Sequence, residues 1–210
     1  FSATDYVGHA FGPDSREVED DLLALDTTIG ALLDKLDRDA GAGQYIVALT
    51  ADHGVAPVPE QARLLGHDAG RVDARAVVER IEKAMAQKLG EGRYVAQFIP
   101  PDLYFAPGVV SRLDSDPSLW RAVQQAALAE PGVANAIRRT KQAPEAGTTA
   151  LARALAFDLY PERSGDAWIG LKPNWIFSAL AATGTTRGSA REYDQRVPII
   201  LFGSGVKRGQ

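Results

Sequence analysis

The chain has 210 residues, of which 45% are hydrophobic and 24% charged, and it contains no cysteine. This composition is typical of an ordinary globular protein, and the lack of cysteine excludes disulfides, thiolate nucleophiles and zinc–thiolate sites. The net charge of −4 argues against binding to a nucleic-acid backbone, and no apolar run is long enough to span a membrane. Phe1 begins directly within a motif and no signal peptide precedes it, so we interpret the chain as an internal piece of a longer protein.

The N-terminal quarter predicts one long helix and one buried strand, each next to a polar loop. Residues 1–14 are rich in glycine and are expected to form a strand end and a loop. Ser15 is the expected N-cap of a helix through about Asp37, because apolar residues recur there every three or four positions. Residues 45–50 predict a buried parallel strand, and residues 51–59 a loop at its carboxyl end. Ligands usually bind at that edge of an open α/β sheet.

The middle of the chain predicts a helix, two strands, a helix and a strand, at residues 73–89, 93–99, 102–106, 115–129 and 133–138. Residues 142–149 are expected to form a polar linker, and strand-like runs follow at 168–172 and 197–202. We therefore expect an α/β protein whose mainly parallel sheet is flanked by helices. Its expected parts are a core segment with the metal loops, a small α+β insertion and a return to the core, at residues 1–67, 68–142 and 143–210.

Two pairs of a carboxylate and an imidazole are the strongest candidates for chemistry. Asp5 and His9 lie four residues apart in the first expected loop, and Asp52 and His53 directly follow the expected buried strand. Carboxylate and imidazole together suit Zn²⁺ or a similar divalent ion. We expect Gly8 and Gly54 to allow the tight backbone that directs both pairs toward one pocket.

These motifs resemble the type I phosphodiesterase/nucleotide pyrophosphatase branch of the alkaline phosphatase superfamily. The resemblance rests on Asp5-x-x-Gly-His9-x-x-Gly-Pro13, on the run Thr50-Ala51-Asp52-His53-Gly54, and on a final segment with Gly-Thr-Thr-Arg-Gly-Ser at 184–189 and Val-Pro-Ile-Ile-Leu-Phe-Gly at 197–203. Within that branch, the chain is most similar to bacterial alkaline phosphatases with a threonine nucleophile. The resemblance covers both ends of the chain, whereas the expected insertion is not diagnostic.

The resemblance implies two Zn²⁺ ions about 4 Å apart. Asp5 and His9 would bind the first ion, and Asp52 and His53 the second, with further ligands from an N-terminal segment of the same protein that precedes this chain. The nucleophile would also lie in that segment, so no catalytic residue is assigned here. By the same resemblance the intact protein would form a phospho-enzyme intermediate, act on a small-molecule phosphate ester and be periplasmic or secreted, while this piece alone would be inactive.

Arg187 departs from the family pattern, in which the corresponding residue is a histidine that binds the first ion. A guanidinium has no lone pair for a metal and stays protonated, so the first site is in doubt. Arg187 is then either a variant residue in a protein with a weakened first site, or a cation that stands in place of the ion and pairs with Asp5.

The sequence therefore predicts a metal-dependent hydrolase of phosphate monoesters. The alternatives are a phosphodiesterase or nucleotide pyrophosphatase, and a non-catalytic pseudoenzyme in which Arg187 impairs the first metal site. Sulfatases and phosphomutases share the metal core and remain rivals among enzymes.

Overall fold

The computed structural model describes residues 1–139, 149–160, 162–178, 184–207 and 209. They form two compact units, which we describe separately. The first unit consists of Phe1–Val58, Thr183–Arg187 and Glu192–Gln210, and the second of Pro59–Ala182 and Gly188–Arg191. None of the helices in the described ranges is both long and apolar enough to cross a membrane.

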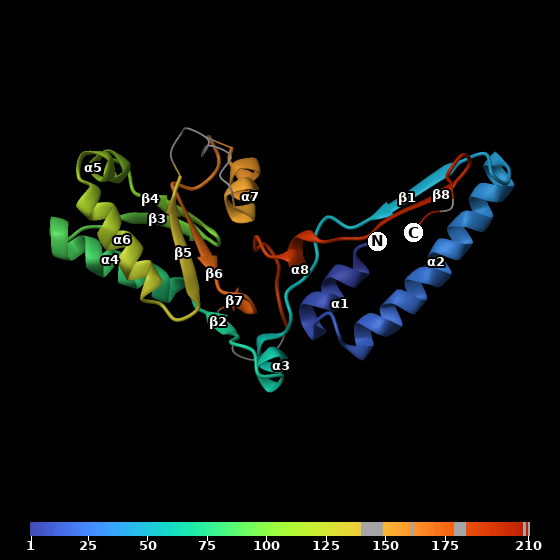
Figure 1. Ribbon diagram of the computed structural model, residues 1–210, viewed down its shortest axis with the longest axis horizontal. Coiled ribbons are helices and arrows are strands. Elements are labelled where there is room, and N and C mark those ends of the chain that lie inside the picture. The colour runs from blue at the N-terminus through green and yellow to red at the C-terminus, as the bar shows by residue number, and fades with distance from the viewer. Residues whose placement is uncertain (140–148, 161, 179–183, 208, 210) are drawn as a thin grey trace. The chain divides into compact units, whose positions relative to one another are not determined.

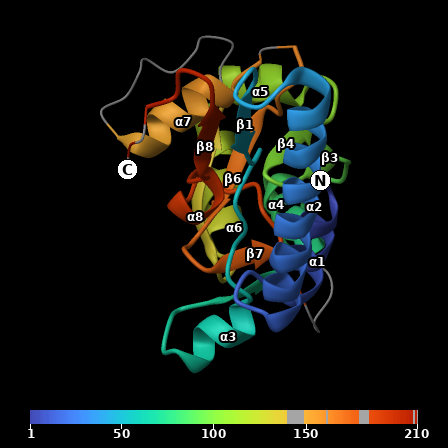
Figure 2. The same cartoon turned by 90° about the vertical axis from the view of Figure 1, so that its right-hand side faces the viewer.

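The first unit contains two helices that lie side by side, one further short helix and a ribbon of two strands (Figures 1 and 2). Its elements are α1 (Ala3–Phe11), α2 (Arg16–Ala40), β1 (Ile46–Thr50), the short α8 (Glu192–Gln195) and β8 (Ile199–Gly203). The side chain of Ser15 accepts a hydrogen bond from the Val18 amide and so caps α2, as predicted. The Thr4 hydroxyl donates to Asp21 at 2.7 Å and joins α1 to α2.

Two expectations for this unit are wrong. Residues 3–11 form a helix rather than a strand end and loop, with Asp5 in its first turn and His9 in its last, which complements the helix dipole. Strand β1 is not a buried parallel strand, since it pairs antiparallel with β8 from Ile46↔Gly203 to Thr50↔Ile199 and alternates between exposed and half-buried residues. An apolar run does not reveal its partner, and here the returning chain end supplies an antiparallel one.

The second unit is an α+β structure around a four-stranded sheet in the order β3-β4-β6-β5. Its elements are α3 (Pro59–Leu64), β2 (Gly70–Val72), α4 (Ala74–Leu89), β3 (Val95–Ile99), β4 (Asp102–Phe105), α5 (Val109–Ser115), α6 (Pro117–Leu128), β5 (Val133–Arg138), α7 (Ala150–Asp158), β6 (Ala167–Leu171) and β7 (Trp175–Phe177). Helices α4 and α6 pack together beside the sheet (Figure 1). Residues from these helices and strands form the hydrophobic core, whose most buried members include Val77, Ile81, Met85, Leu103, Val123 and Ile169.

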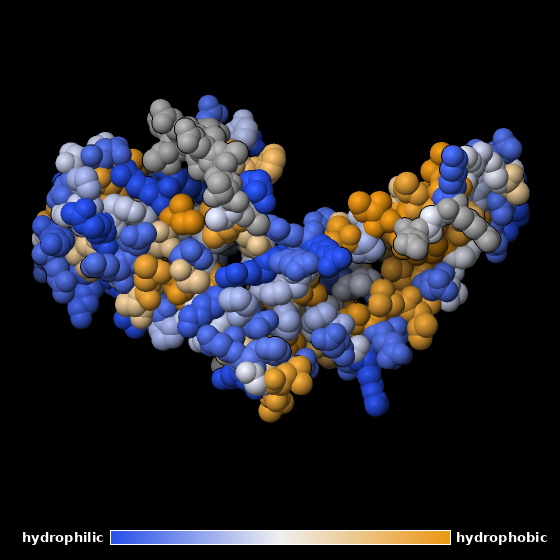
Figure 3. Space-filling view, in the orientation of Figure 1, coloured by the Kyte–Doolittle hydropathy of each residue, from blue (hydrophilic) through white to orange (hydrophobic). Residues whose placement is uncertain are grey.

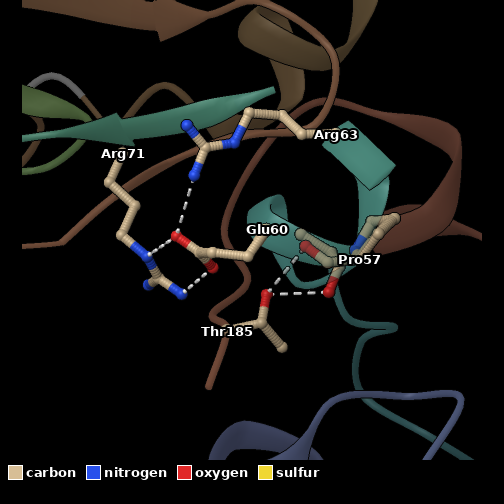
Figure 4. A network of polar contacts seen from close by, with 6 residues as sticks. Pro57, Glu60, Arg63, Arg71 and Thr185 are labelled. Atoms are coloured by element: carbon tan, nitrogen blue, oxygen red, sulfur yellow. Dashed lines mark hydrogen bonds and ion pairs between the residues drawn. The ribbon is translucent and has the colours of Figure 1, made fainter. Parts of the chain in front are cut away.

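An ion pair between Arg71 and Glu60 joins β2 to α3 in this unit. Arg71 Nε and Nη2 donate to the two carboxylate oxygens of Glu60 at 2.9 and 2.7 Å, as Figure 4 shows. This guanidinium lowers the pKa of Glu60 below its ordinary value. Beside it, β2 and β7 pair in parallel.

The helix–strand–strand–helix–strand order expected for the middle of the chain is present as α4, β3, β4, α6 and β5. The structure divides the chain elsewhere than at residues 67 and 142, however. Strand β6, which we expected in the returning core segment, pairs with both β4 and β5 and so completes the four-stranded sheet. The expected linker at 142–149 lies outside the described residues except for Thr149, which caps α7. The helices and the mixture of antiparallel and parallel strands agree with the expected α/β class.

Candidate metal-binding site

Asp5 and His9 lie one turn apart on α1, so both side chains leave the same face of the helix. Asp5 Oδ1 lies 3.3 Å from His9 Nε2. We interpreted these two residues as part of a loop. Their spacing of four residues instead matches the helical repeat and so brings the two side chains together. Gly8 lies inside this helix without positive φ, so its expected role as a residue of a tight loop is wrong.

Asp52 and His53 follow β1 directly, and backbone contacts fix the segment after them. The Gly54 amide donates to the Asp194 carbonyl at 2.8 Å, and the Ala56 amide donates to the Thr186 carbonyl at 3.1 Å. A Cβ atom on Gly54 would lie 2.0 Å from the Tyr193 carbonyl oxygen, so only glycine permits this approach. Gly54 thus has the role that we expected of it.

The two acid–imidazole pairs come together at Asp5. Oδ1 of Asp5 lies 3.5 Å from His53 Nε2, in addition to its 3.3 Å contact with His9, and the two imidazole centroids are 6.5 Å apart. Asp52 Oδ2 lies 3.7 Å from His53 Nε2. The side chains of His53 and His9 are 21% and 30% exposed, whereas that of Asp52 is 89% exposed. Asp52 is therefore the most solvent-exposed member of this group.

Backbone carbonyls determine which nitrogen of each histidine faces the pocket. His9 Nδ1 lies 2.9 Å from the Thr185 carbonyl oxygen, and His53 Nδ1 lies 2.8 Å from the Gly54 carbonyl oxygen. A carbonyl oxygen only accepts hydrogen bonds, so each Nδ1 must carry the hydrogen. Each Nε2 atom then faces Asp5 Oδ1. Two imidazole nitrogens and a carboxylate oxygen at this spacing are stabilised by a proton or a cation between them.

The donor set fits a divalent ion. A metal-binding histidine typically donates its other ring nitrogen to a carbonyl or carboxylate, as both rings do here. Ligand atoms about 2.0–2.1 Å from a tetrahedral Zn²⁺ lie about 3.3 Å from each other, close to the contacts around Asp5. Among the described residues, however, no three or more His, Cys, Asp or Glu side chains converge as a complete metal site. The chain thus offers pairs of donors rather than a closed set.

The loop at 184–187 packs against His9. The Thr185 amide donates to the His9 carbonyl at 2.8 Å, and a Cβ on Gly184, whose φ is +81°, would lie 2.3 Å from that same oxygen. The Thr185 hydroxyl donates to the Ala56 carbonyl at 2.7 Å and lies 3.4 Å from the Pro57 carbonyl (Figure 4). Thr185 belongs to the Gly-Thr-Thr run at 184–186, but nothing in that run shows which carbonyl will meet a histidine.

Arg187 follows this loop, and its side chain is exposed. No ion pair joins it to Asp5 within the described ranges, where Asp5 instead contacts His9 and His53. The hypothesis that Arg187 replaces the first ion by pairing with Asp5 is therefore wrong in this structure.

Comparison with known proteins supports the resemblance. The model of the family "Type I phosphodiesterase / nucleotide pyrophosphatase" matches residues 1–194. The chain is 32% identical over 221 residues to alkaline phosphatase PafA of Elizabethkingia meningoseptica, covering 100% of this chain and 38% of that protein. It is 30% identical over 211 residues to a Myroides odoratus protein named calcium-transporting ATPase, again covering 100% of this chain and 38% of that one.

The fold agrees with these matches. The chain resembles the crystal structure of wild-type PafA with a TM-score of 0.86 and 28% identity, covering 99% of this chain and 39% of that one. The expected α/β class, similar to that of an alkaline phosphatase, is thereby confirmed. The chain spans about 38% of the length of these two curated relatives.

Proposed function

Because this chain belongs to the type I phosphodiesterase/nucleotide pyrophosphatase family, we propose that the intact protein is a metal-dependent hydrolase of phosphate monoesters. The observation that carries the proposal is the convergence of His9 Nε2 and His53 Nε2 on Asp5 Oδ1. Similarity to a protein named alkaline phosphatase favours monoesters over diesters. A periplasmic or secreted location is part of the same proposal.

The side chains of this site have separate tasks in the proposed reaction. Asp5 and His9 would bind one Zn²⁺, and Asp52 and His53 a second, whose set would be completed by ligands from outside this chain. Such ions polarise phosphoryl oxygens and neutralise charge that develops in the transition state. The carbonyls of Thr185 and Gly54 hold both Nδ1 atoms, so both Nε2 atoms are oriented toward Asp5 before any ion binds.

The phosphoryl group would first pass to a hydroxyl nucleophile and then to water. The nucleophile of the proposed reaction lies outside this chain, as the resemblance implies. Residues 1–210 alone are therefore expected to be inactive.

Substituting Asp5 tests the proposal in the full-length protein. Asp5→Asn removes the charge on which both imidazoles converge, so we expect it to lower bound zinc and to reduce kcat/KM for p-nitrophenyl phosphate by at least about 100-fold. Asp20→Asn is the matched control, since Asp20 is exposed on α2 and has no ion pair in the described part of the chain. Zinc is measured by plasma mass spectrometry on the same samples. Unchanged zinc and turnover in the Asp5 variant would refute the proposed site.

Two alternatives predict different outcomes. A phosphodiesterase, which the family's description favours, would hydrolyse bis(p-nitrophenyl) phosphate faster than the monoester. A pseudoenzyme, which Arg187 favours because it cannot bind metal, would show no turnover of either ester and would bind less than one equivalent of zinc. The wild-type protein alone distinguishes these outcomes.

A further inference from the structure

The backbone that directly precedes Arg187 is hydrogen-bonded to α1 and to the segment after His53. Thr185 exchanges two hydrogen bonds with His9, through its amide and its carbonyl, and Thr186 accepts one from Ala56. Consecutive Cα atoms are about 3.8 Å apart, so the Arg187 Cα lies no more than about 7.6 Å from the Cα of Thr185. The position of Arg187 is therefore tied to both α1 and the segment after His53.

The charge of Arg187 has no counterion among the residues that the structure describes. Its side chain is exposed, and no ion pair or side-chain hydrogen bond of Arg187 occurs in the ranges that the structure describes. Arg196, in the same unit, differs because it forms a 2.9 Å ion pair with Glu192 on α8. A solvated surface arginine would equally be exposed, but it would not follow a loop that is bonded to a site histidine. Placement rather than exposure thus distinguishes Arg187.

We propose that Arg187 binds the phosphoryl oxygens of a phosphate monoester at the site formed by Asp5, His9 and His53. This inference rests on the proposed function and adds a residue that selects the substrate. A guanidinium donates two parallel hydrogen bonds to a phosphate and keeps its charge at every relevant pH. A monoester carries close to two negative charges at neutral pH and a diester carries one, so the cation favours the monoester.

The test measures binding of inorganic phosphate to the zinc-loaded full-length protein by calorimetry. Arg187→Ala is expected to raise the dissociation constant of phosphate about tenfold, through loss of charged hydrogen bonds, while bound zinc stays unchanged. Arg187→Lys is expected to recover part of this loss, because an ammonium keeps the charge but not the planar fork. The matched control Arg196→Ala removes an equal charge from the same unit and is expected to change the constant less than about twofold.

Ester selectivity provides a second measurement. Arg187→Ala is expected to lower the ratio of kcat/KM for p-nitrophenyl phosphate to that for bis(p-nitrophenyl) phosphate by about tenfold. The inference would be overturned if the Arg187→Ala protein bound phosphate within about twofold of the wild-type affinity. It would also be overturned if this variant lost zinc in parallel, because Arg187 would then support the ion site. Failure of the proposed function would appear separately, as absence of monoester turnover in the wild-type protein.

Discussion

Glu60 and Arg71 show how one ionised pair makes part of this protein sensitive to pH. Both carboxylate oxygens of Glu60 accept from Arg71, and the Arg63 guanidinium lies 3.7 Å away (Figure 4). The hydrogen bonds from Arg71 lower the pKa of Glu60 more than partial burial raises it. The Arg71 side chain is 11% exposed and that of Glu60 is 36% exposed, so solvent screens the pair from one side only.

We therefore predict that Glu60→Gln destabilises the second unit by about 0.5–1 kcal/mol at about pH 7. The ionised pair stabilises the fold at pH values above 4.5, the ordinary pKa of a glutamate side chain. This contribution is lost as the pH falls through the pKa of Glu60 in the folded state, which is lower. The difference between the variant and the wild type should thus vanish in acid. Urea unfolding of the 210-residue chain followed by tryptophan fluorescence measures it, because all three tryptophans of this chain, Trp120, Trp168 and Trp175, belong to this unit.

The control for this prediction is Glu91→Gln, which neutralises an exposed carboxylate of the same unit. It should leave the urea midpoint unchanged at both pH values. A Glu60→Gln protein that is equally destabilised at about pH 3 and about pH 7 would show that packing, rather than charge, accounts for the effect.

At the scale of elements, helix α1 and the segment after β1 hold the site by different means. Asp5 and His9 depend on the helical repeat, whereas His53 depends on the close approach of Gly54 to Tyr193. A Cβ atom on Gly54 would meet the Tyr193 carbonyl oxygen at 2.0 Å, but a Cβ on Gly8 would meet nothing within 4 Å. Glycine is therefore required in one element and replaceable in the other.

Alanine at these two glycines should have opposite effects in the full-length protein. Gly54→Ala forces the backbone away from Tyr193 and displaces His53, so we expect zinc affinity to fall at least about tenfold. Gly8→Ala adds a better helix former to α1 and should preserve zinc affinity while stabilising the protein by up to about 1 kcal/mol. Competition with a chelator measures the first effect and calorimetry the second. Equal zinc affinity in both variants would contradict this account of the site.

The sequence predicted the helices whose local pattern is clear, and it predicted the candidate metal-binding residues from their chemical type. Periodicity and capping indicated α2 and α4, and the residues of the two acid–imidazole pairs could be chosen without coordinates. Helix α1 was missed although its apolar residues recur every three or four positions, because Gly8 and Gly12 were interpreted as signs of a loop. Local pattern could not assign β6 to its sheet, since the pairing with β4 and β5 is set by contacts between distant residues.

At the scale of the whole molecule, the two units differ in how completely they bury their apolar residues. The hydrophobic core cluster of the described residues lies in the second unit. In the first unit, Ile46, Ile199 and Leu201 are 63%, 76% and 56% exposed, and Figure 3 shows hydrophobic surface over β1, β8 and part of α2. Apolar residues on both faces of a two-stranded ribbon are typical of strands inside a larger, covered sheet.

The rest of the intact protein is expected to cover this ribbon, since the chain spans about 38% of the length of its relatives. Burying each of these side chains would contribute about 1.5–3 kcal/mol. This chain has no cysteine, so Leu201→Cys introduces a thiol whose access to a labelling reagent reports the cover. In the native full-length protein this thiol should react at least about tenfold more slowly than in the urea-unfolded protein, whereas Asp20→Cys on the exposed side of α2 should react at similar rates in both states. Fast labelling at residue 201 in the native protein would mean that β8 stays uncovered in the intact molecule.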